Sequence, residues 1–193
     1  DYLGKKMRIE HSLCNQLLIA MPGMADSNFN NSVTLICEHN TEGALGIVIN
    51  RPIKMRLGEL FQQLNIDSIN QNILEEQIFN GGPVAQEQGF VIHDPSKMFA
   101  NTLNVSEEIQ LTLSKDIINS LATGDGPKNT LIALGYAGWA AGQLESEILS
   151  NTWLTVPATP EIIFEIPFSK RWHYAANIIG IDLSLLTKNA GHA

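Results

Sequence analysis

The sequence predicts an α+β protein with a mixed, largely antiparallel sheet. Three observations support this fold class: apolar segments rich in β-branched residues recur along the chain, short polar or glycine-containing turns suited to hairpins join several of them, and segments with helical spacing lie between them. A chain of 193 residues can build one sizeable core. We therefore expect one domain over residues 1–193.

The first quarter of the chain is expected to form a strand, a loop and a hairpin. Residues 17–20 are continuously apolar and precede a proline, as in a buried strand. Residues 23–32 carry the small polar side chains that favour turns. Residues 33–38 and 44–50 are rich in β-branched residues and flank a polar turn with a glycine, which predicts two paired strands.

The middle of the chain predicts a helix, a turn and two strands. Apolar residues at the spacing of one helix face occupy residues 57–64. Residues 78–84 contain a paired-glycine turn, residues 89–94 form a strand that a proline ends, and residues 108–113 alternate as a strand does.

Residues 114–193 predict three helices and two strands. Ser114 is a suitable N-cap for a helix that Gly124 ends. The remaining elements are a buried strand over 130–137, a helix over 139–150, a strand over 153–156 and a helix with Trp172, Ala176 and Ile179 on one face, ended by Gly180.

Charge and hydropathy restrict the partners. Twelve Lys and Arg against twenty Asp and Glu give a formal charge of −8, which argues against direct nucleic-acid binding. The longest uncharged segment, residues 129–144, is shorter than the roughly 20 apolar residues of a membrane-spanning helix, so no membrane association is expected. No secretory signal is visible, which predicts a cytoplasmic protein. Residues 1–6 are expected to be flexible or additional to a natural start, for which Met7 is a candidate.

Two cysteines, Cys14 and Cys37, are too few for a disulfide framework and predict a reducing compartment. A buried thiol is the expected state of Cys37, because it lies in an apolar strand. A bridge between Cys14 and Cys37 stays open as an alternative.

Several sequence blocks together resemble the bacterial YqgE/AlgH family. They are Leu17 to Pro22, Ile36 to Asn40, Gly43 to Pro52, Gly81 to Val84, Gly135 to Trp139, and Gln143-Leu144-Glu145. The resemblance implies a small cytoplasmic α+β protein whose sheet is bifurcated, partly barrel-like and surrounded by helices. It implies no catalytic residues, since the family is described as of unknown function with a transcriptional-regulator label.

Polar residues at the hairpin turn form the first candidate surface. Glu38, His39 and Asn40 lie at the turn, where a carboxylate beside an imidazole can position a proton acceptor. Asn50 is expected at the far end of its strand. The competing interpretation is that these residues only satisfy backbone groups of the turn.

Two further segments offer possible contacts. The turn Asn80-Gly81-Gly82-Pro83 can present backbone amides to an anion. Trp139 and Gln143 are four apart on a predicted helix and can share a face, although a core tryptophan is the competing interpretation.

Other residue combinations give weaker evidence of a functional site. Cys37 and His39 are two apart and can face one side of a strand as a thiol–imidazole pair or as two metal ligands, but a structural zinc site needs about four ligands, so no metal is expected. The glycines between 135 and 142 depart from a dinucleotide loop, so no cofactor is expected. Adjacent strand residues such as His93 and Asp94 point to opposite faces, which argues against a catalytic dyad.

The sequence therefore predicts a non-enzymatic cytoplasmic protein that binds an unknown protein partner or small ligand, with a possible indirect regulatory role and no assigned catalytic residue. One alternative is an enzyme or small-molecule sensor with a site near Glu38, His39, Gly81 and Gly82. The other is a direct DNA-binding transcriptional regulator, which the charge of −8 disfavours. The predicted ligand or partner surface comprises Glu38, His39, Asn40, Asn50, Asn80, Gly81, Gly82, Pro83, Trp139 and Gln143.

Overall fold

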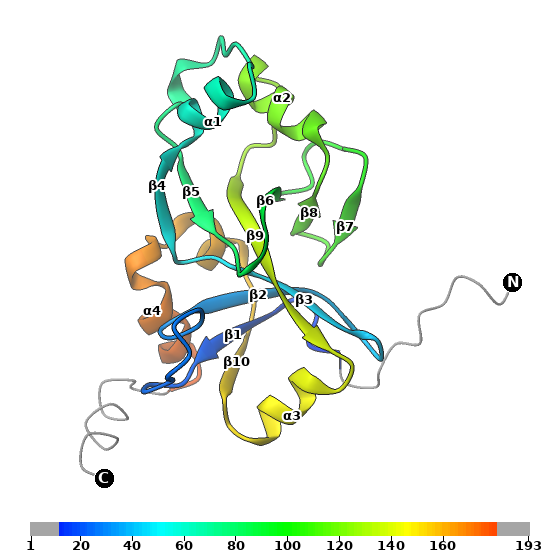
Figure 1. Cartoon of the computed structure of the whole chain (residues 1–193), viewed down its shortest axis with the longest axis vertical. Helices are drawn as coiled ribbons and strands as arrows, with labels where there is room; N and C mark the ends of the chain where they lie inside the picture. Colours follow the sequence, from blue (N-terminus) through cyan, green and yellow to red (C-terminus); the bar gives the residue numbers. More distant parts are fainter. Residues whose placement is uncertain (1–11, 181–193) are drawn as a thin grey trace, which may run out of the picture.

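The computed structural model describes residues 12–180 (Figure 1), so the expectation for residues 1–6 lies outside the described residues. The strands are β1 (Gln16–Ala20), β2 (Val33–Asn40), β3 (Gly43–Val48), β4 (Pro52–Arg56), β5 (Gln77–Asn80), β6 (Val84–His93), β7 (Thr102–Asn104), β8 (Gln110–Thr112), β9 (Thr130–Ala140) and β10 (Trp153–Pro157). The α-helices are α1 (Leu57–Gln63), α2 (Lys115–Thr123), α3 (Gln143–Leu149) and α4 (Arg171–Ile178). A π-helical turn, η2 (Glu161–Glu165), precedes α4.

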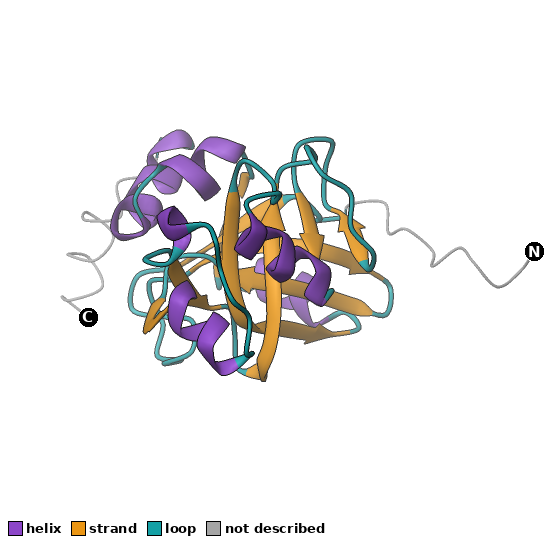
Figure 2. Ribbon diagram, turned by 90° about the horizontal axis from the view of Figure 1, so that it is seen from above, coloured by secondary structure: helices purple, strands orange, loops and turns teal. Residues whose placement is uncertain are grey.

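Strand β9 joins the two branches of the sheet. The strand order is β10-β1-β2-β3-β9-β6-β8-β7, and β9 also pairs in parallel with β5, whose other neighbour is β4. The start of β9 pairs with β5 and β6, whereas residues 137–140 pair with β3, so β9 crosses from one branch to the other (Figure 1). The curled sheet forms a half-barrel with helices around it (Figure 2), which confirms the predicted α+β class and the bifurcated, mostly antiparallel sheet.

Three apolar clusters hold the fold together. The largest fills the half-barrel and includes Leu35, Phe90 and the strand and helix residues around them. A second lies where α1 and α2 pack on the outer face of β5, β6 and β9. A third packs α3 against β1, β2 and the end of β9, with Trp139 and Trp153 at its centre. The hairpin β2–β3 thus has apolar contacts on both faces.

The helix predicted over 139–150 begins four residues later than expected. Trp139 belongs to β9, where it pairs with Ala44 of β3, and α3 starts at Gln143. Pairing with β3 extends β9 past residue 137, where the predicted strand ends. The contacts with a neighbouring strand outweigh the local preference of these residues. Gly142, at φ 75°, makes the break between strand and helix.

Sequence reasoning also missed three short strands. Strand β4 starts at Pro52. Proline lacks a backbone N–H, but this is tolerated at the first residue of a strand. Strands β5 and β7 are only four and three residues long, too short for a periodic pattern. In the last helix, Ile179 lies past the end of α4 and is 40% exposed, so it does not share the buried face of Ala176.

The loop between β1 and β2 is held by Asn50 and Arg51, which lie between β3 and β4. Asn50 Oδ1 accepts from the N–H of Val33 at 2.9 Å, and its Nδ2 donates to the carbonyl of Asn31 at 3.0 Å. The Arg51 guanidinium donates to the carbonyls of Ser27, Asn28 and Asn30. Asn50 therefore lies at the end of the strand away from the turn, as predicted, and its side chain holds the β1–β2 loop through these hydrogen bonds.

Arg171 is a buried cation that binds backbone carbonyls. Its Nε donates to the carbonyls of Ile162 and Ile166, each at 3.0 Å, and its Nη1 donates to the carbonyl of Ile49. Its guanidinium carbon lies 5.4 Å from the centre of the Phe79 ring. Burial lowers the pKa of Arg171 to about 10, so the side chain keeps its charge at neutral pH. It joins η2 and α4 to the end of β3.

His93 is buried within a chain of hydrogen bonds. Its Nδ1 donates to the backbone carbonyl of Asp94 at 2.7 Å, and its Nε2 lies 2.6 Å from Oγ1 of Thr112. The Asp94 carboxylate instead accepts from the backbone N–H groups of Ser96 and Asn129, at 2.8 and 2.6 Å. The carboxylate does not orient the imidazole, in agreement with the strand geometry expected from the sequence.

The burial of His93 predicts a loss of stability at acidic pH. Desolvation lowers the pKa of His93 below its ordinary value, although the hydrogen bond to Asp94 opposes this effect. The unfolded chain therefore takes up the proton first, and stability falls as the pH drops below about 6.5 towards the folded-state pKa. Urea unfolding from pH 8 to pH 5 should show this loss, and His93→Gln should reduce it. His173→Gln, at an exposed position, should leave the loss unchanged; equal losses in wild type and His93→Gln would contradict the prediction.

Candidate functional site

A β-bulge sets the directions of the side chains near the β2–β3 turn. Ile36 pairs with Gly46 and Glu38 pairs with Leu45, which leaves Cys37 as an extra residue in β2. A bulge shifts the alternation of side chains along a strand and can re-aim one of them. Cys37 packs in the half-barrel cluster, whereas His39 reaches towards α3. The expectation that Cys37 and His39 face one side is therefore wrong, and the bulge is the reason.

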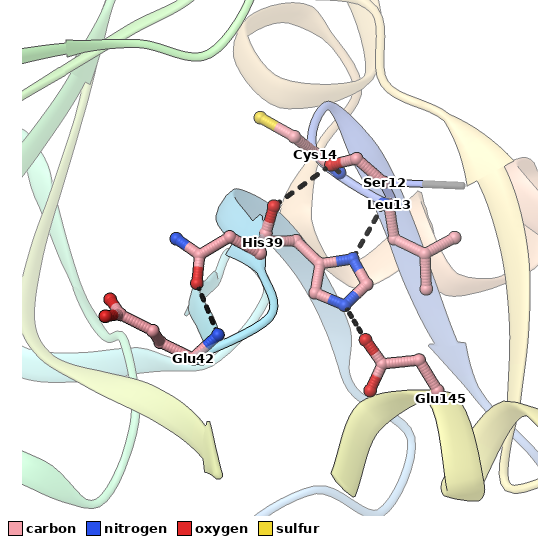
Figure 3. A network of polar contacts seen from close by, with 7 residues as sticks. Ser12, Leu13, Cys14, His39, Glu42 and Glu145 are labelled. Atoms are coloured by element: carbon pink, nitrogen blue, oxygen red, sulfur yellow. Dashed lines mark hydrogen bonds and ion pairs between the residues drawn. The ribbon is translucent and has the colours of Figure 1, made fainter. Parts of the chain in front are cut away.

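His39 connects three segments of the chain through its two ring nitrogens (Figure 3). Its Nδ1 accepts from the backbone N–H of Leu13 at 2.8 Å, so Nε2 carries the proton and donates to Oε1 of Glu145 on α3. The carbonyl of His39 also accepts from Oγ of Ser12 at 3.3 Å. The His39 side chain is fully buried, while that of Glu145 is 40% exposed. Both ring nitrogens are occupied, which suits a positioning role.

The contact between His39 and Glu145 predicts energetic coupling between β2 and α3. In a double-mutant cycle of His39→Ala and Glu145→Ala, we expect a coupling free energy of about 1–2 kcal/mol, since residues in direct contact couple by roughly 0.5–3 kcal/mol. Free energies of unfolding in urea provide the measurement. The matched cycle of His39→Ala with Ser146→Ala, an exposed neighbour on α3, should give a value near zero. Equal values in the two cycles would disprove the coupling.

A cavity of about 360 Å³ lies beside the hairpin turn, and we call it the hairpin pocket. Its lining residues are Glu38, Asn40, Glu42, Gly43, Ala44, Leu45, Tyr136, Gly138 and Trp139. Asn40 is 7% exposed and orders the acidic side of the pocket: its Nδ2 donates to Oε1 of Glu38 at 3.2 Å, and its Oδ1 accepts from the N–H of Glu42 at 2.8 Å. Among residues 12–180, the pocket lining thus combines two carboxylates and two aromatic residues, with no lysine or arginine.

A second cavity, of about 450 Å³, adjoins the first, and we call it the cysteine pocket. Its lining residues are Ser12, Cys14, Cys37, Glu38, His39, Asn40, Leu103, Asn104 and Val105. Glu38 and Asn40 belong to both linings. Sγ of Cys14 lies 3.3 Å from the carbonyl oxygen of Cys37, and no disulfide joins the two residues. Burial raises the pKa of the Cys37 thiol, and the nearby Cys14 and Glu38 add to this effect.

The turn at Asn80 to Pro83 belongs to neither pocket lining and packs on β9. The N–H of Gly81 donates to the carbonyl of Leu134 at 2.8 Å, and the N–H of Gly82 donates to Oδ1 of Asn80 at 3.1 Å. Pro83 has no N–H to offer. These backbone amides therefore have partners within the protein, a geometry that does not favour the anion contact considered from the sequence.

Trp139 and Gln143 meet through a residue that sequence reasoning did not select. Trp139 Nε1 and Trp153 Nε1 both donate to Oε1 of Glu147, each at 3.2 Å, and Gln143 Nε2 lies 3.3 Å from its Oε2. The helical face predicted for Trp139 and Gln143 is wrong, since Trp139 lies in β9. Glu147 instead ties α3 to two strands.

The structure brings together part of the predicted surface. Glu38, Asn40 and Trp139 line the hairpin pocket, whereas His39 turns to Glu145, Asn50 holds the β1–β2 loop and Gln143 contacts Glu147. Sequence reasoning missed Tyr136 and Glu42 of the pocket and the carboxylates of α3. Glu42 lies inside the predicted turn and could have been selected, but no sequence signal links Glu145 to His39 across 106 residues.

Comparison with protein families identifies the lineage of the chain. A family model described as AlgH-like matches residues 17–184. The chain belongs to this AlgH-like family. It is similar to a UPF0301 protein of Methylococcus capsulatus, with 49% identity over 180 residues that cover 93% of this chain and 96% of that protein. A UPF0301 protein of Thioalkalivibrio sulfidiphilus is 49% identical over 187 residues, which cover 97% of this chain and 100% of the relative.

Solved structures agree with the family assignment. The solution structure of the AlgH protein from Pseudomonas aeruginosa has a TM-score of 0.78 and 45% identity, covering 98% of this chain and 100% of that one. A crystal structure of a protein from Corynebacterium diphtheriae has a TM-score of 0.72 at 19% identity, over 96% and 98% of the two chains, and so shows a shared fold. The resemblance found in the sequence is confirmed.

Proposed function

We propose that this AlgH-like protein is a non-enzymatic cytoplasmic protein that binds a partner or small ligand through a positively charged group in the hairpin pocket. The observation that carries the proposal is the lining of that pocket, in which Glu38 and Glu42 lie beside Tyr136 and the described residues include no basic one. Carboxylates attract an ammonium or guanidinium group, and the face of an aromatic ring does so as well. Any regulatory role would follow indirectly from this binding.

The shape of the pocket supports binding of such a group. Gly138 of β9 pairs with Leu45 of β3 and lies next to the Tyr136 ring, since a Cβ at position 138 would come within 3.4 Å of Cε2 of Tyr136. The absence of a side chain there leaves room beside the ring. Asn40 holds Glu38 and the backbone of Glu42 in place, so the acidic side of the pocket is ordered before a ligand arrives. Such pre-organisation reduces the entropic cost of binding.

The geometry of His39 favours binding over catalysis. A general base needs a ring nitrogen within reach of the substrate, and both nitrogens of His39 already have partners in Leu13 and Glu145. The backbone amides of Gly81 and Gly82 are occupied too. These contacts weigh against an enzyme or sensor centred on His39 and the glycine turn.

Titration of the ¹⁵N-labelled protein with spermidine and with arginine methyl ester tests the proposal. We expect saturable amide shifts at Glu42, Tyr136 and Gly138, with affinity reduced about tenfold in Glu38→Gln, a loss that corresponds to about 1.4 kcal/mol. Glu108→Gln, at an exposed position outside the hairpin pocket, is the matched control and should bind as wild type does. Glutarate, an anionic probe, should cause no saturable shift. Equal responses to glutarate and spermidine, or none to either cation, would contradict the proposal.

The formal charge of −8 remains an argument against direct DNA binding. A gel-shift experiment with duplexes of varied sequence at low salt should show no complex. A salt-sensitive shift would instead favour a directly acting regulator. In the part of the chain from residue 12 to residue 180, no helix has the length and apolar character required to span a membrane.

A further inference from the structure

Two cysteines from separate segments face each other where the chain enters β1. The N–H of Asn15 donates to the carbonyl of Ile36 at 2.9 Å, and Oγ of Ser12 donates to the carbonyl of His39 at 3.3 Å. These bonds hold the segment before β1 against β2, so that Cys14 lies next to Cys37.

The environment of the two thiols gives them different access to solvent. Cys14 is half-buried, and its Sγ lies 3.3 Å from the carbonyl oxygen of Cys37 and 3.7 Å from that of Val105. Cys37 is 3% exposed, and its Sγ lies 3.6 Å from the carbonyl oxygen of Leu35. Both residues line the cysteine pocket. A small oxidant that enters this pocket therefore meets Cys14 before Cys37.

We propose that Cys14 and Cys37 are a modification site at which a hydroperoxide produces a reversible intramolecular disulfide. The Cys14 thiolate attacks the terminal peroxide oxygen and breaks the O–O bond, which gives a sulfenic acid and an alkoxide, or hydroxide when the oxidant is hydrogen peroxide. The released anion takes up the proton that the thiol lost and becomes an alcohol or water. The Cys37 thiol then loses its proton as its sulfur attacks the Cys14 sulfur, forms the S–S bond and displaces hydroxide, which takes up that proton to become water. Two thiols are thus oxidised and one peroxide is reduced.

The order of the two steps follows from burial. The thiolate is the reactive form of cysteine, and the raised pKa of Cys37 keeps it protonated, so Cys14 is the residue that meets the peroxide. The second step requires the Cys14 side chain to turn from the carbonyl oxygen of Cys37 towards its sulfur. A cellular dithiol reverses the bridge by exchange, as expected for a cytosolic disulfide.

The bridge does not depend on ligand binding at the hairpin pocket, but it would affect that pocket. Glu38 follows Cys37 directly and lines both cavities, as does Asn40. A covalent bond from Cys37 to the segment before β1 would fix the bulge that directs Glu38. Oxidation therefore offers a means to alter the proposed ligand site without a change in the fold.

Peroxide treatment of the full chain, followed by alkylation under denaturing conditions, tests the proposal. Untreated protein should take up two alkyl groups, and treated monomer should take up none and lose two hydrogen atoms in mass. Cleavage before Asp26 separates the cysteines, so fragments 1–25 and 26–66 should stay joined until dithiothreitol is added. Joined fragments from a single chain are the expected result.

The single variants Cys14→Ser and Cys37→Ser complete the test. In Cys37→Ser, the sulfenic acid on Cys14 should accumulate and be trapped by dimedone, whereas wild type should yield little adduct because Cys37 resolves it. Three outcomes would overturn the proposal: both thiols of treated wild type still alkylate, Cys14 gains two oxygen atoms instead of a partner, or the linked fragments come from two chains. Each of these outcomes is visible in wild type, so the test does not depend on the variants folding.

Discussion

Gly82→Ala is expected to lower the free energy of unfolding by about 3–5 kcal/mol, or to prevent folding altogether, because it combines backbone strain with a collision in the core. Gly82 has a φ of 155°, and a Cβ there would lie 2.2 Å from the carbonyl carbon of Tyr136 and 2.4 Å from the N of Ala137. Both atoms are backbone of β9, which has partners on either side and cannot move away. Urea unfolding followed by circular dichroism provides the measurement.

Gly89→Ala is the matched control for this prediction. Gly89 lies in β6 and, like Gly82, is next to β9, but a Cβ there would meet no atom within 4 Å and φ is not positive. Alanine also reduces the conformational freedom of the unfolded chain, so this variant should be as stable as wild type or slightly more so. A loss below about 1 kcal/mol in Gly82→Ala would show that the turn is not held against β9 as described.

Arg171→Met is expected to cost about 3–5 kcal/mol of unfolding free energy. Methionine fills the space of the aliphatic part of arginine, so the substitution mainly removes the guanidinium group and its hydrogen-bond donors. The carbonyls of Ile49, Ile162 and Ile166 then lose a charged donor. Each buried acceptor left without a partner costs about 1–3 kcal/mol, and the stacking over Phe79 is lost too.

Lys170→Met provides the control for Arg171→Met. Lys170 is the preceding residue and is exposed, so the same new side chain there should change stability by less than about 0.5 kcal/mol. Arg171→Lys should be intermediate, because an ammonium group reaches fewer of the three carbonyls than a guanidinium does. Equal effects at positions 170 and 171 would contradict the role given to Arg171.

The strands and helices that sequence reasoning recovered are those whose local pattern agrees with their packing. The hairpin is one example: β-branched runs on either side of the turn at Gly43 pair as β2 and β3. Helix α2 is another, since its apolar face packs on the sheet and Gly124 ends it at φ 84°. In both cases, residues close in sequence determine the outcome.

The site was harder to predict because its geometry depends on residues far apart in sequence. The bulge at Cys37 lies in a run of apolar residues, so no break in alternation marks it, yet it decides that Cys37 and His39 face different sides. Trp139 belongs to β9 because this part of the strand pairs with β3. Its spacing of four residues from Gln143, which suggested a shared helix face, is a coincidence. Glu38, His39 and Asn40 at the hairpin turn were identified from the sequence, but Glu145, the partner of His39 on α3, was not.

The central place of β9 has a consequence for how the protein forms in the cell. The strand pairs with β3, β5 and β6, yet it begins only at residue 130. While the ribosome is still making the first two thirds of the chain, neither branch of the sheet can complete its pairing, and apolar strands such as β2 lack their full cover. Long-range pairing of this kind slows folding and leaves apolar surface exposed, where it can aggregate. We expect the protein to fold after synthesis of β9, and to depend on chaperones during translation.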